Sequence, residues 1–140
     1  VAVTRLIFAG VLERHPRLKL VLSHGGGTLP ALAGRLDLGW SAPRYEANPA
    51  CRANISRPPS THLRSLYYDT VVASPGLLEF IIRTYGPDHV LFGTDFPYEI
   101  GDAEGDLAWP MLAALPDAER EMIQSGNALR LLGGRAPRAV

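Results

Sequence analysis

Cysteine is nearly absent from this 140-residue sequence, which contains only Cys51. A single cysteine excludes an internal disulfide bond and a metal cluster held by several thiolates. This usage is typical of a reducing compartment, so we expect a cytoplasmic protein. The length suffices for one domain with a hydrophobic core, and we predict a single, partial domain over residues 1–140.

An excess of either charge is also missing. The sequence has 14 Lys and Arg and 14 Asp and Glu, which gives a formal net charge of zero. We therefore expect no nucleic-acid partner, and a hydrophobic content of 46% argues against disorder. No apolar run reaches about 18 residues, so we expect no membrane partner or span, and no signal-peptide pattern is present.

An initiator methionine is lacking as well. The chain begins at Val1 and passes almost at once into a predicted helix. We expect it to be a portion of a longer enzyme.

Strand and helix patterns alternate along the sequence. Short apolar runs bounded by turn formers predict three strands, at 18–24, 66–72 and 89–95. Apolar residues at helical spacing predict helices at 4–14, 29–40 and 75–85. This alternation indicates a parallel sheet with helical crossovers. Because three strands would leave bare edges and a (β/α)8 barrel needs about 250 residues, we predict the last three strand–helix units of such a TIM barrel.

The remaining segments are less regular. Residues 41–62 contain several prolines and arginines and predict a long loop. After the third strand, an acidic loop at 98–106 precedes further helices at about 106–115 and 117–125, with a last turn at 128–132. Asn127 is expected to cap that last turn.

Titratable side chains follow two of the strands directly. His24 ends the strand at 18–24, and Asp95 ends the strand at 89–95. The carboxyl ends of parallel strands are where ligands and catalytic groups collect, so these residues could converge on one pocket. The alternatives are a structural histidine and an aspartate that only forms a turn.

The three glycines after His24 have a second interpretation. In lipase-type hydrolases an HGGG sequence after a strand supplies an oxyanion hole, together with a downstream Gly-x-Ser-x-Gly elbow. No serine in the chain stands in that frame. We therefore reject a serine hydrolase.

Four stretches together resemble the amidohydrolase-related family (amidohydrolase 2), in its branch that contains aminocarboxymuconate-semialdehyde decarboxylase. The resemblance runs from about residue 5 to residue 133. Its motifs are Ser23 to Gly27 with Gly34 to Asp37, Tyr67 to Val72 with Pro75, Val90 to Pro97 with Gly101, and Gly126 to Ala128 ending in Leu132 and Gly133.

The resemblance implies a metal-dependent barrel that usually holds zinc. It implies that Asp95 is a metal ligand and that His24 is the general acid/base. It also implies that Arg35 reaches the site of a neighbouring subunit in a homodimer and holds a substrate carboxylate, and that Tyr98 lines the substrate.

The family's other metal ligands, a His-x-His pair on the first strand and a histidine on the fifth strand, would precede Val1. With Asp95 alone, this chain should not hold zinc tightly. We predict a carboxy-lyase that acts on a small aromatic or muconate-type carboxylate. The alternatives are a hydrolase or hydratase on the same barrel, and a truncated fragment without catalysis.

Overall fold

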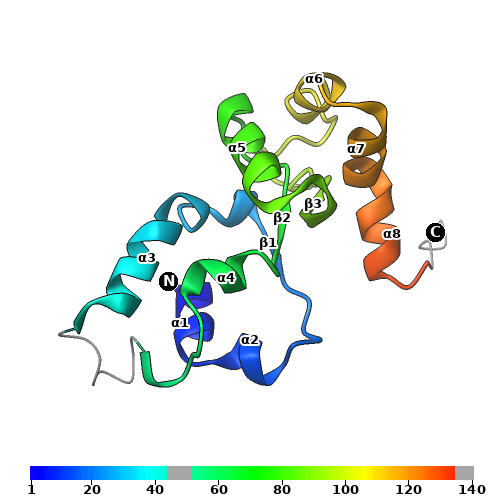
Figure 1. Cartoon of the computed structure of the whole chain (residues 1–140). Helices are drawn as coiled ribbons and strands as arrows, with labels where there is room; N and C mark the ends of the chain where they lie inside the picture. The colour runs from blue at the N-terminus through cyan, green and yellow to red at the C-terminus, as the bar shows by residue number, and fades with distance from the viewer. Residues whose placement is uncertain (44–51, 135–140) are drawn as a thin grey trace. The chain divides into compact units, whose positions relative to one another are not determined.

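The computed structural model describes residues 1–43 and 52–134. The chain divides into two compact units (Figure 1). Unit 1 comprises Val1–Leu20 and Thr28–Leu66, and unit 2 comprises Val21–Gly27 and Tyr67–Val140. The single domain predicted over the whole chain stays a prediction.

Unit 1 is helical in its described part. Its elements are α1 (Ala2–Phe8), α2 (Val11–Arg14), the 3-10 turn η2 (Pro30–Leu32), α3 (Ala33–Ser41) and α4 (Pro59–Leu63). The predicted helix 4–14 is thus interrupted, because Gly10 lies at φ 73° and a Cβ there would meet the Asn54 carbonyl oxygen at 2.3 Å. The predicted helix 29–40 begins as a 3-10 turn, and Leu32 in that turn is 46% exposed although it is apolar.

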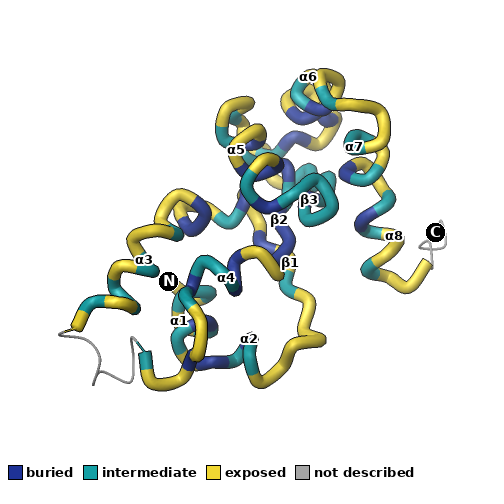
Figure 2. Tube along the Cα trace, in the orientation of Figure 1, coloured by how far each residue is buried: buried dark blue, intermediate teal, exposed yellow. Residues whose placement is uncertain are grey.

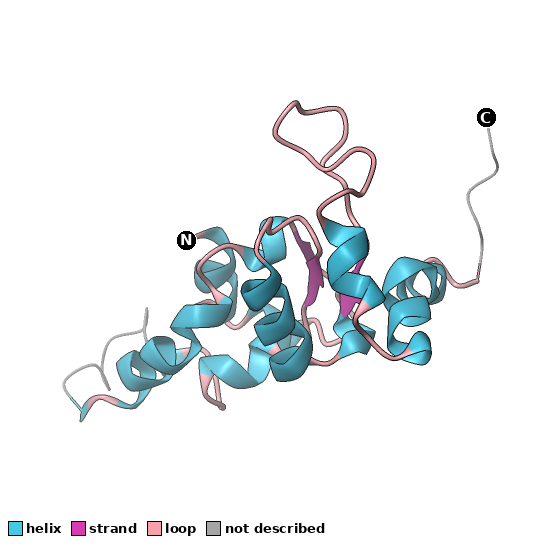
Figure 3. Cartoon of the chain, turned by 90° about the horizontal axis from the view of Figure 1, so that it is seen from above, coloured by secondary structure: helices cyan, strands magenta, loops and turns pink. Residues whose placement is uncertain are grey.

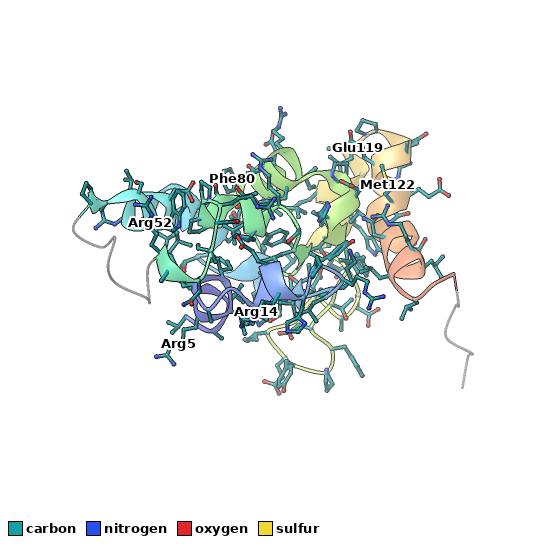
Figure 4. The ribbon with its side chains drawn as sticks, turned by 60° about the horizontal axis from the view of Figure 1, so that its bottom comes forward. Arg5, Arg14, Arg52, Phe80, Glu119 and Met122 are labelled. Carbon is teal, nitrogen blue, oxygen red and sulfur yellow. The ribbon has the colours of Figure 1, made fainter. Side chains whose placement is uncertain are left out.

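Helix α4 lies inside the segment 41–62 that was predicted to be a loop. Pro59 stands at its first position, and the Asp37 carboxylate accepts a hydrogen bond from Ser60 N at 2.9 Å, which satisfies a free N–H at the start of the helix. Residues 44–51 of the predicted loop lie outside the described residues. Arg52, labelled in Figure 4, places its guanidinium 5.3 Å from the centre of the Trp40 ring, within the range of a cation–π interaction.

Unit 2 contains the sheet. Strands β1 (Val21–Leu22), β2 (Tyr67–Asp69) and β3 (Val90–Leu91) are all parallel, in the order β1-β2-β3. Figure 3 shows the strands in magenta, among the surrounding helices. Val21 pairs with Tyr67, and Asp69 pairs with Leu91. The predicted parallel α/β sheet is confirmed, but each strand is shorter than its predicted range because only two or three residues make ladder hydrogen bonds.

Helix α5 (Pro75–Tyr85) connects β2 to β3 and begins as its sequence predicts. The Ser74 hydroxyl accepts a bond from Leu77 N at 3.4 Å, and Pro75 takes the first position. The inner face of α5 and the strand β2 are buried (Figure 2). Tyr68 is fully buried and stacks on Tyr85, with 4.6 Å between the ring centres.

The segment after α5 completes unit 2. It contains the 3-10 turn η5 (Pro87–His89) before β3, then α6 (Ala108–Ala113), α7 (Asp117–Glu121), a π-helix η6 (Met122–Gly126) and α8 (Asn127–Leu131). The last three elements run on without a break. The prediction that Asn127 caps a separate turn is therefore wrong.

Asn127 instead covers the outer edge of β3. Its side-chain amide donates to the carbonyl oxygens of Val90 at 2.6 Å and Pro87 at 2.8 Å, while Phe92 N donates to the Ile123 carbonyl at 2.9 Å. Asn127 is completely buried, as a polar side chain can be when it is hydrogen-bonded. These bonds satisfy backbone groups that a neighbouring strand would otherwise pair.

Across the described residues, no helix is both long and apolar enough to cross a membrane.

A buried histidine in unit 1 provides a test of this packing. His62 is 4% exposed, and its Nε2 lies 3.2 Å from Glu13 Oε1, which also accepts a bond from Ser56 N. Burial lowers the pKa of His62 from 6.5, outweighing the raising effect of Glu13. For Glu13, burial raises the pKa, but the hydrogen bonds from Ser56 and Arg57 and the charge of His62 together lower the net pKa.

We expect unit 1 to lose stability in mild acid. A histidine with a lowered pKa in the folded chain binds fewer protons than in the unfolded chain, so its contribution is complete above about pH 6.5 and declines as the pH falls, by at most about 1.4 kcal/mol per pH unit. Urea unfolding between about pH 7.5 and 5 should show this slope, and His62→Gln should flatten it. His15→Gln, which changes an exposed histidine, should keep the wild-type slope. Equal slopes in His62→Gln and wild type would contradict the assignment.

Candidate active site

The carboxyl ends of the three strands carry unusual backbone conformations. Among the described residues, three non-glycine residues have positive φ: His24 at 55° after β1, Ala73 at 47° after β2 and Asp95 at 57° after β3. A side chain disfavours this region, so such residues cluster where a function requires them. Two of the three are the site residues that the sequence predicted.

His24 opens a left-handed turn. His24, Gly25, Gly26 and Gly27 all have positive φ, and the first three form a 3-10 turn, η1 (His24–Gly26). A Cβ on Gly25 would stand 2.4 Å from Val72 Cγ1, and one on Gly26 would stand 3.0 Å from the Tyr68 ring. Gly25 and Gly26 are therefore favoured by close packing as well as by conformation, and Gly27 by conformation alone.

The N–H groups of this turn are already bonded. His24 N donates to Asp69 Oδ2 at 3.0 Å, and Gly25 N donates to Asp69 Oδ1 at 2.8 Å. Gly26 N and Gly27 N donate to the carbonyls of Ser23 and His24. An oxyanion hole needs free N–H groups, so this geometry agrees with the rejection of a lipase-type site.

Asp95 lies in a compact turn after β3. Its carbonyl accepts a bond from Tyr98 N at 3.0 Å, and the carbonyl of Thr94 accepts one from Asp102 N at 2.7 Å. Asp102 is buried, and its carboxylate accepts bonds from Leu107 N and Ala108 N, the latter at the start of α6. Asp102 thus connects the loop that carries Asp95 to the helix that follows.

The two predicted side chains lie at the same edge of the sheet. Because β1 and β3 are parallel and flank β2, their carboxyl ends are two strand spacings apart, about 10 Å. His24 is exposed and Asp95 half-buried, and neither side chain makes a hydrogen bond among the described residues. Both are open to a ligand.

The other predicted residues occupy different places. Tyr98 lies three residues beyond Asp95 and is 66% exposed. Arg35 is an exposed residue of α3 in unit 1, so the structure does not relate it to the strand ends. The His89 ring stacks on Tyr67 with 4.8 Å between the ring centres.

The described residues do not form a complete metal centre. No three His, Cys, Asp or Glu side chains among them come together in a way that could hold an ion. A catalytic zinc site normally takes three protein ligands, so Asp95 could supply one carboxylate ligand but not a whole site.

The sequence alone left two residues at the site without an assigned role. Asp69 ends β2 and holds the His24 turn, and Thr70 bonds to both backbone groups of Gly93, two residues before Asp95. The available signal was the Asp-Thr pair inside the predicted strand 66–72, because the carboxyl end of that strand lies at the same edge as His24 and Asp95.

The chain belongs to the amidohydrolase family, whose family model matches residues 1–134. Its solved relatives confirm the predicted fold class. The structure of an apo IDCase from Metarhizium anisopliae superposes with a TM-score of 0.77 at 32% identity, covering 94% of this chain and 38% of that one. A dihydroxybenzoic acid decarboxylase from Polaromonas with bound manganese and 2-nitroresorcinol gives 0.75 at 28% identity, covering 95% and 39%.

Curated relatives with similar sequences are decarboxylases. The chain is 29% identical over 131 residues to 2-amino-3-carboxymuconate-6-semialdehyde decarboxylase of Caenorhabditis elegans, covering 94% of this chain and 32% of that protein. It is 32% identical over 132 residues to gamma-resorcylate decarboxylase of a Rhizobium species, covering 91% and 38%. The chain thus spans about a third to two fifths of these relatives and corresponds to part of a (β/α)8 barrel.

The packing of the His24 turn can be tested directly. Gly25→Ala should lower the free energy of unfolding by about 2–5 kcal/mol, because it combines a positive φ with a Cβ that contacts Val72 and Ile81 too closely. Gly76→Ala is the matched control: Gly76 lies in α5 of the same unit, and a Cβ there would meet no atom within 4 Å. It should be neutral or slightly stabilising. Similar losses in both variants would contradict the packing argument.

Proposed function

We propose that this chain is the part of a metal-dependent decarboxylase that supplies the general acid/base and one carboxylate metal ligand. The observation that carries the proposal is the placement of His24 and Asp95, each in a left-handed conformation, at one edge of a parallel sheet. Family membership and the decarboxylase names of the relatives support it.

The proposed substrate is a carboxylic acid on an aromatic or similarly unsaturated carbon. Gamma-resorcylate and 6-methylsalicylic acid, which appear in the names of relatives, are both aromatic acids with the carboxyl group on a ring carbon. The aminocarboxymuconate semialdehyde of the Caenorhabditis relative also carries a carboxyl group on an unsaturated carbon.

His24 would carry the proton in this reaction. An imidazole exchanges protons near neutral pH, which suits a general acid/base. Loss of CO2 leaves an electron pair on the ring carbon, and that carbon must gain a proton in place of the carboxyl group. His24 would donate this proton, while its exposure at the strand end gives a substrate access to the ring.

Arg35 and Tyr98 have binding roles in the proposal. Arg35 is exposed on α3, and its guanidinium would grip a substrate carboxylate in a partner subunit of a homodimer. The exposed ring of Tyr98 would contact the aromatic substrate. We assign the enzyme to the cytoplasm on its single cysteine.

The metal assignment is divalent, with zinc as our first choice and manganese, present in a solved relative, as the competitor. The other ligands must come from outside the described residues, since these lack a complete ligand set. The same observation favours the alternative that this chain alone is inactive. A hydrolase or hydratase on the same site is the other alternative, since one barrel serves several chemistries.

Metal binding by the isolated chain is the first test. We expect purified chain to retain well below one equivalent of zinc or manganese, because a single carboxylate is a weak ligand set. Elemental analysis after dialysis measures this, with Asp95→Ala as the comparison and Asp106→Ala, an exposed carboxylate of the same unit, as the control. A full equivalent that only Asp95→Ala loses would show that the site assembles within this chain.

A chimera tests the reaction. This chain would replace the matching segment of the Rhizobium gamma-resorcylate decarboxylase, which supplies the rest of the barrel. We expect the chimera to bind metal and release CO2 from gamma-resorcylate, and His24→Asn to lower kcat by about 10²–10⁴-fold with metal retained.

Asp95→Ala in the chimera should lose the metal. A folded, metal-loaded chimera that releases no CO2 from gamma-resorcylate or 6-methylsalicylate, yet hydrolyses esters or amides, would overturn the proposed function.

A further inference from the structure

The left-handed turn at His24 has the geometry of an anion-binding nest. Successive backbone N–H groups in a tight turn can point toward one anion, and the N–H groups of His24 and Gly25 do so here. Here the anion belongs to the protein: the Asp69 carboxylate accepts from His24 N at 3.0 Å with one oxygen and from Gly25 N at 2.8 Å with the other. Its Oδ1 also accepts from Val71 N at 3.1 Å.

Asp69 stands where it can hold the turn rigidly. It is the last residue of β2, the central strand, which is hydrogen-bonded to β1 on one side and β3 on the other. The bond to Val71 N fixes the carboxylate against its own strand, so the two bonds to the turn have a fixed acceptor. Bonds to an ionised acceptor are stronger than neutral ones.

Thr70, the residue after Asp69, holds the segment that follows β3, the other strand beside β2. Thr70 is 2% exposed, and its hydroxyl donates to the Gly93 carbonyl and accepts from Gly93 N, both at 3.1 Å. Gly93 lies two residues before Asp95. Adjacent residues at the end of β2 thus bind the chain segments that carry both predicted site residues.

We propose that Asp69 is a positioning residue for His24. Its carboxylate holds the His24 backbone in a conformation that a side chain disfavours, and this determines where the imidazole leaves the sheet edge. The inference rests on the proposed function for the role of His24 in proton transfer. The hydrogen bonds to Asp69 can be tested without activity.

The first measurement uses the wild-type chain. Scalar couplings across hydrogen bonds, from the amide nitrogens of His24 and Gly25 to the Asp69 carboxylate carbon, should be detectable by NMR. The same two amides should exchange with deuterium slowly, although His24 is exposed. Absence of the couplings together with fast exchange would overturn the proposal, whatever the variants show.

Asp69→Asn is the informative substitution because it keeps the shape of the side chain. Its NH2 group cannot accept a hydrogen bond, so one of the two turn amides loses its acceptor. We expect exchange of the amide that loses its acceptor, either His24 or Gly25, to accelerate about tenfold or more, with the buried amides of α5 unchanged. Asp106→Asn removes an exposed carboxylate of the same unit and should change neither set.

The activity of the chimera then distinguishes a positioning role of Asp69 from a general structural role. Asp69→Asn should lower kcat by about 100-fold, with KM and metal content near wild type, since a small misplacement of a reacting group has an effect of this size. Equal acceleration of exchange in α5 would show a merely structural role and overturn the inference, as would an unchanged kcat in an active chimera. If the chimera without the Asp69 substitution binds metal but is inactive, the proposed function is contradicted. In that case amide exchange alone decides whether Asp69 holds the turn.

Discussion

The carboxylate of Asp69, bound by the backbone N–H groups of His24 and Gly25, joins the central strand of this sheet to the turn that carries its predicted acid/base. Each strand is only two or three residues long, so the ladder supplies few bonds at the carboxyl edge. Side chains supply the other hydrogen bonds at this edge. Asp69 and Thr70 extend β2 beyond its last ladder bonds, and the loops on both sides take their conformation from that extension.

A buried polar side chain also covers the open edge of the sheet, on the outer side of β3. Asn127 and the carbonyl of Ile123 occupy the backbone groups on the outer side of β3 that a further strand would use. A buried amide is tolerated there because its NH2 group makes two hydrogen bonds. In unit 1, Glu13, Ser56 and His62 form a comparable cluster, in which a carboxylate accepts the bonds that the Ser56 segment offers. Polar side chains thus help to hold short elements in both units.

The chain spans only part of the length of its family relatives, and this explains why its described residues do not form a complete metal site. The chain covers about a third to two fifths of its relatives, and its described residues lack the ligand set that a divalent ion requires. What it does contain is the framework that places one histidine and one aspartate at a common edge. A barrel divides its site among the ends of many strands, so a part of the barrel carries a corresponding part of the chemistry.

The order of residues was enough to predict the parallel α/β sheet, helix α5, and the placement of His24 and Asp95 at strand ends, because the hydrophobic period of a segment is a local property. Local patterns overestimated the strands, missed the break at Gly10 and misassigned Asn127, because these outcomes depend on contacts with distant segments. Leu32 fits a helical stripe in the sequence yet is exposed, since a stripe is buried only where another element covers it. The role of Asp69 belongs to the same class: its partners lie 44 and 45 residues earlier in the chain, and only the pairing of β1 with β2 brings them within hydrogen-bonding distance.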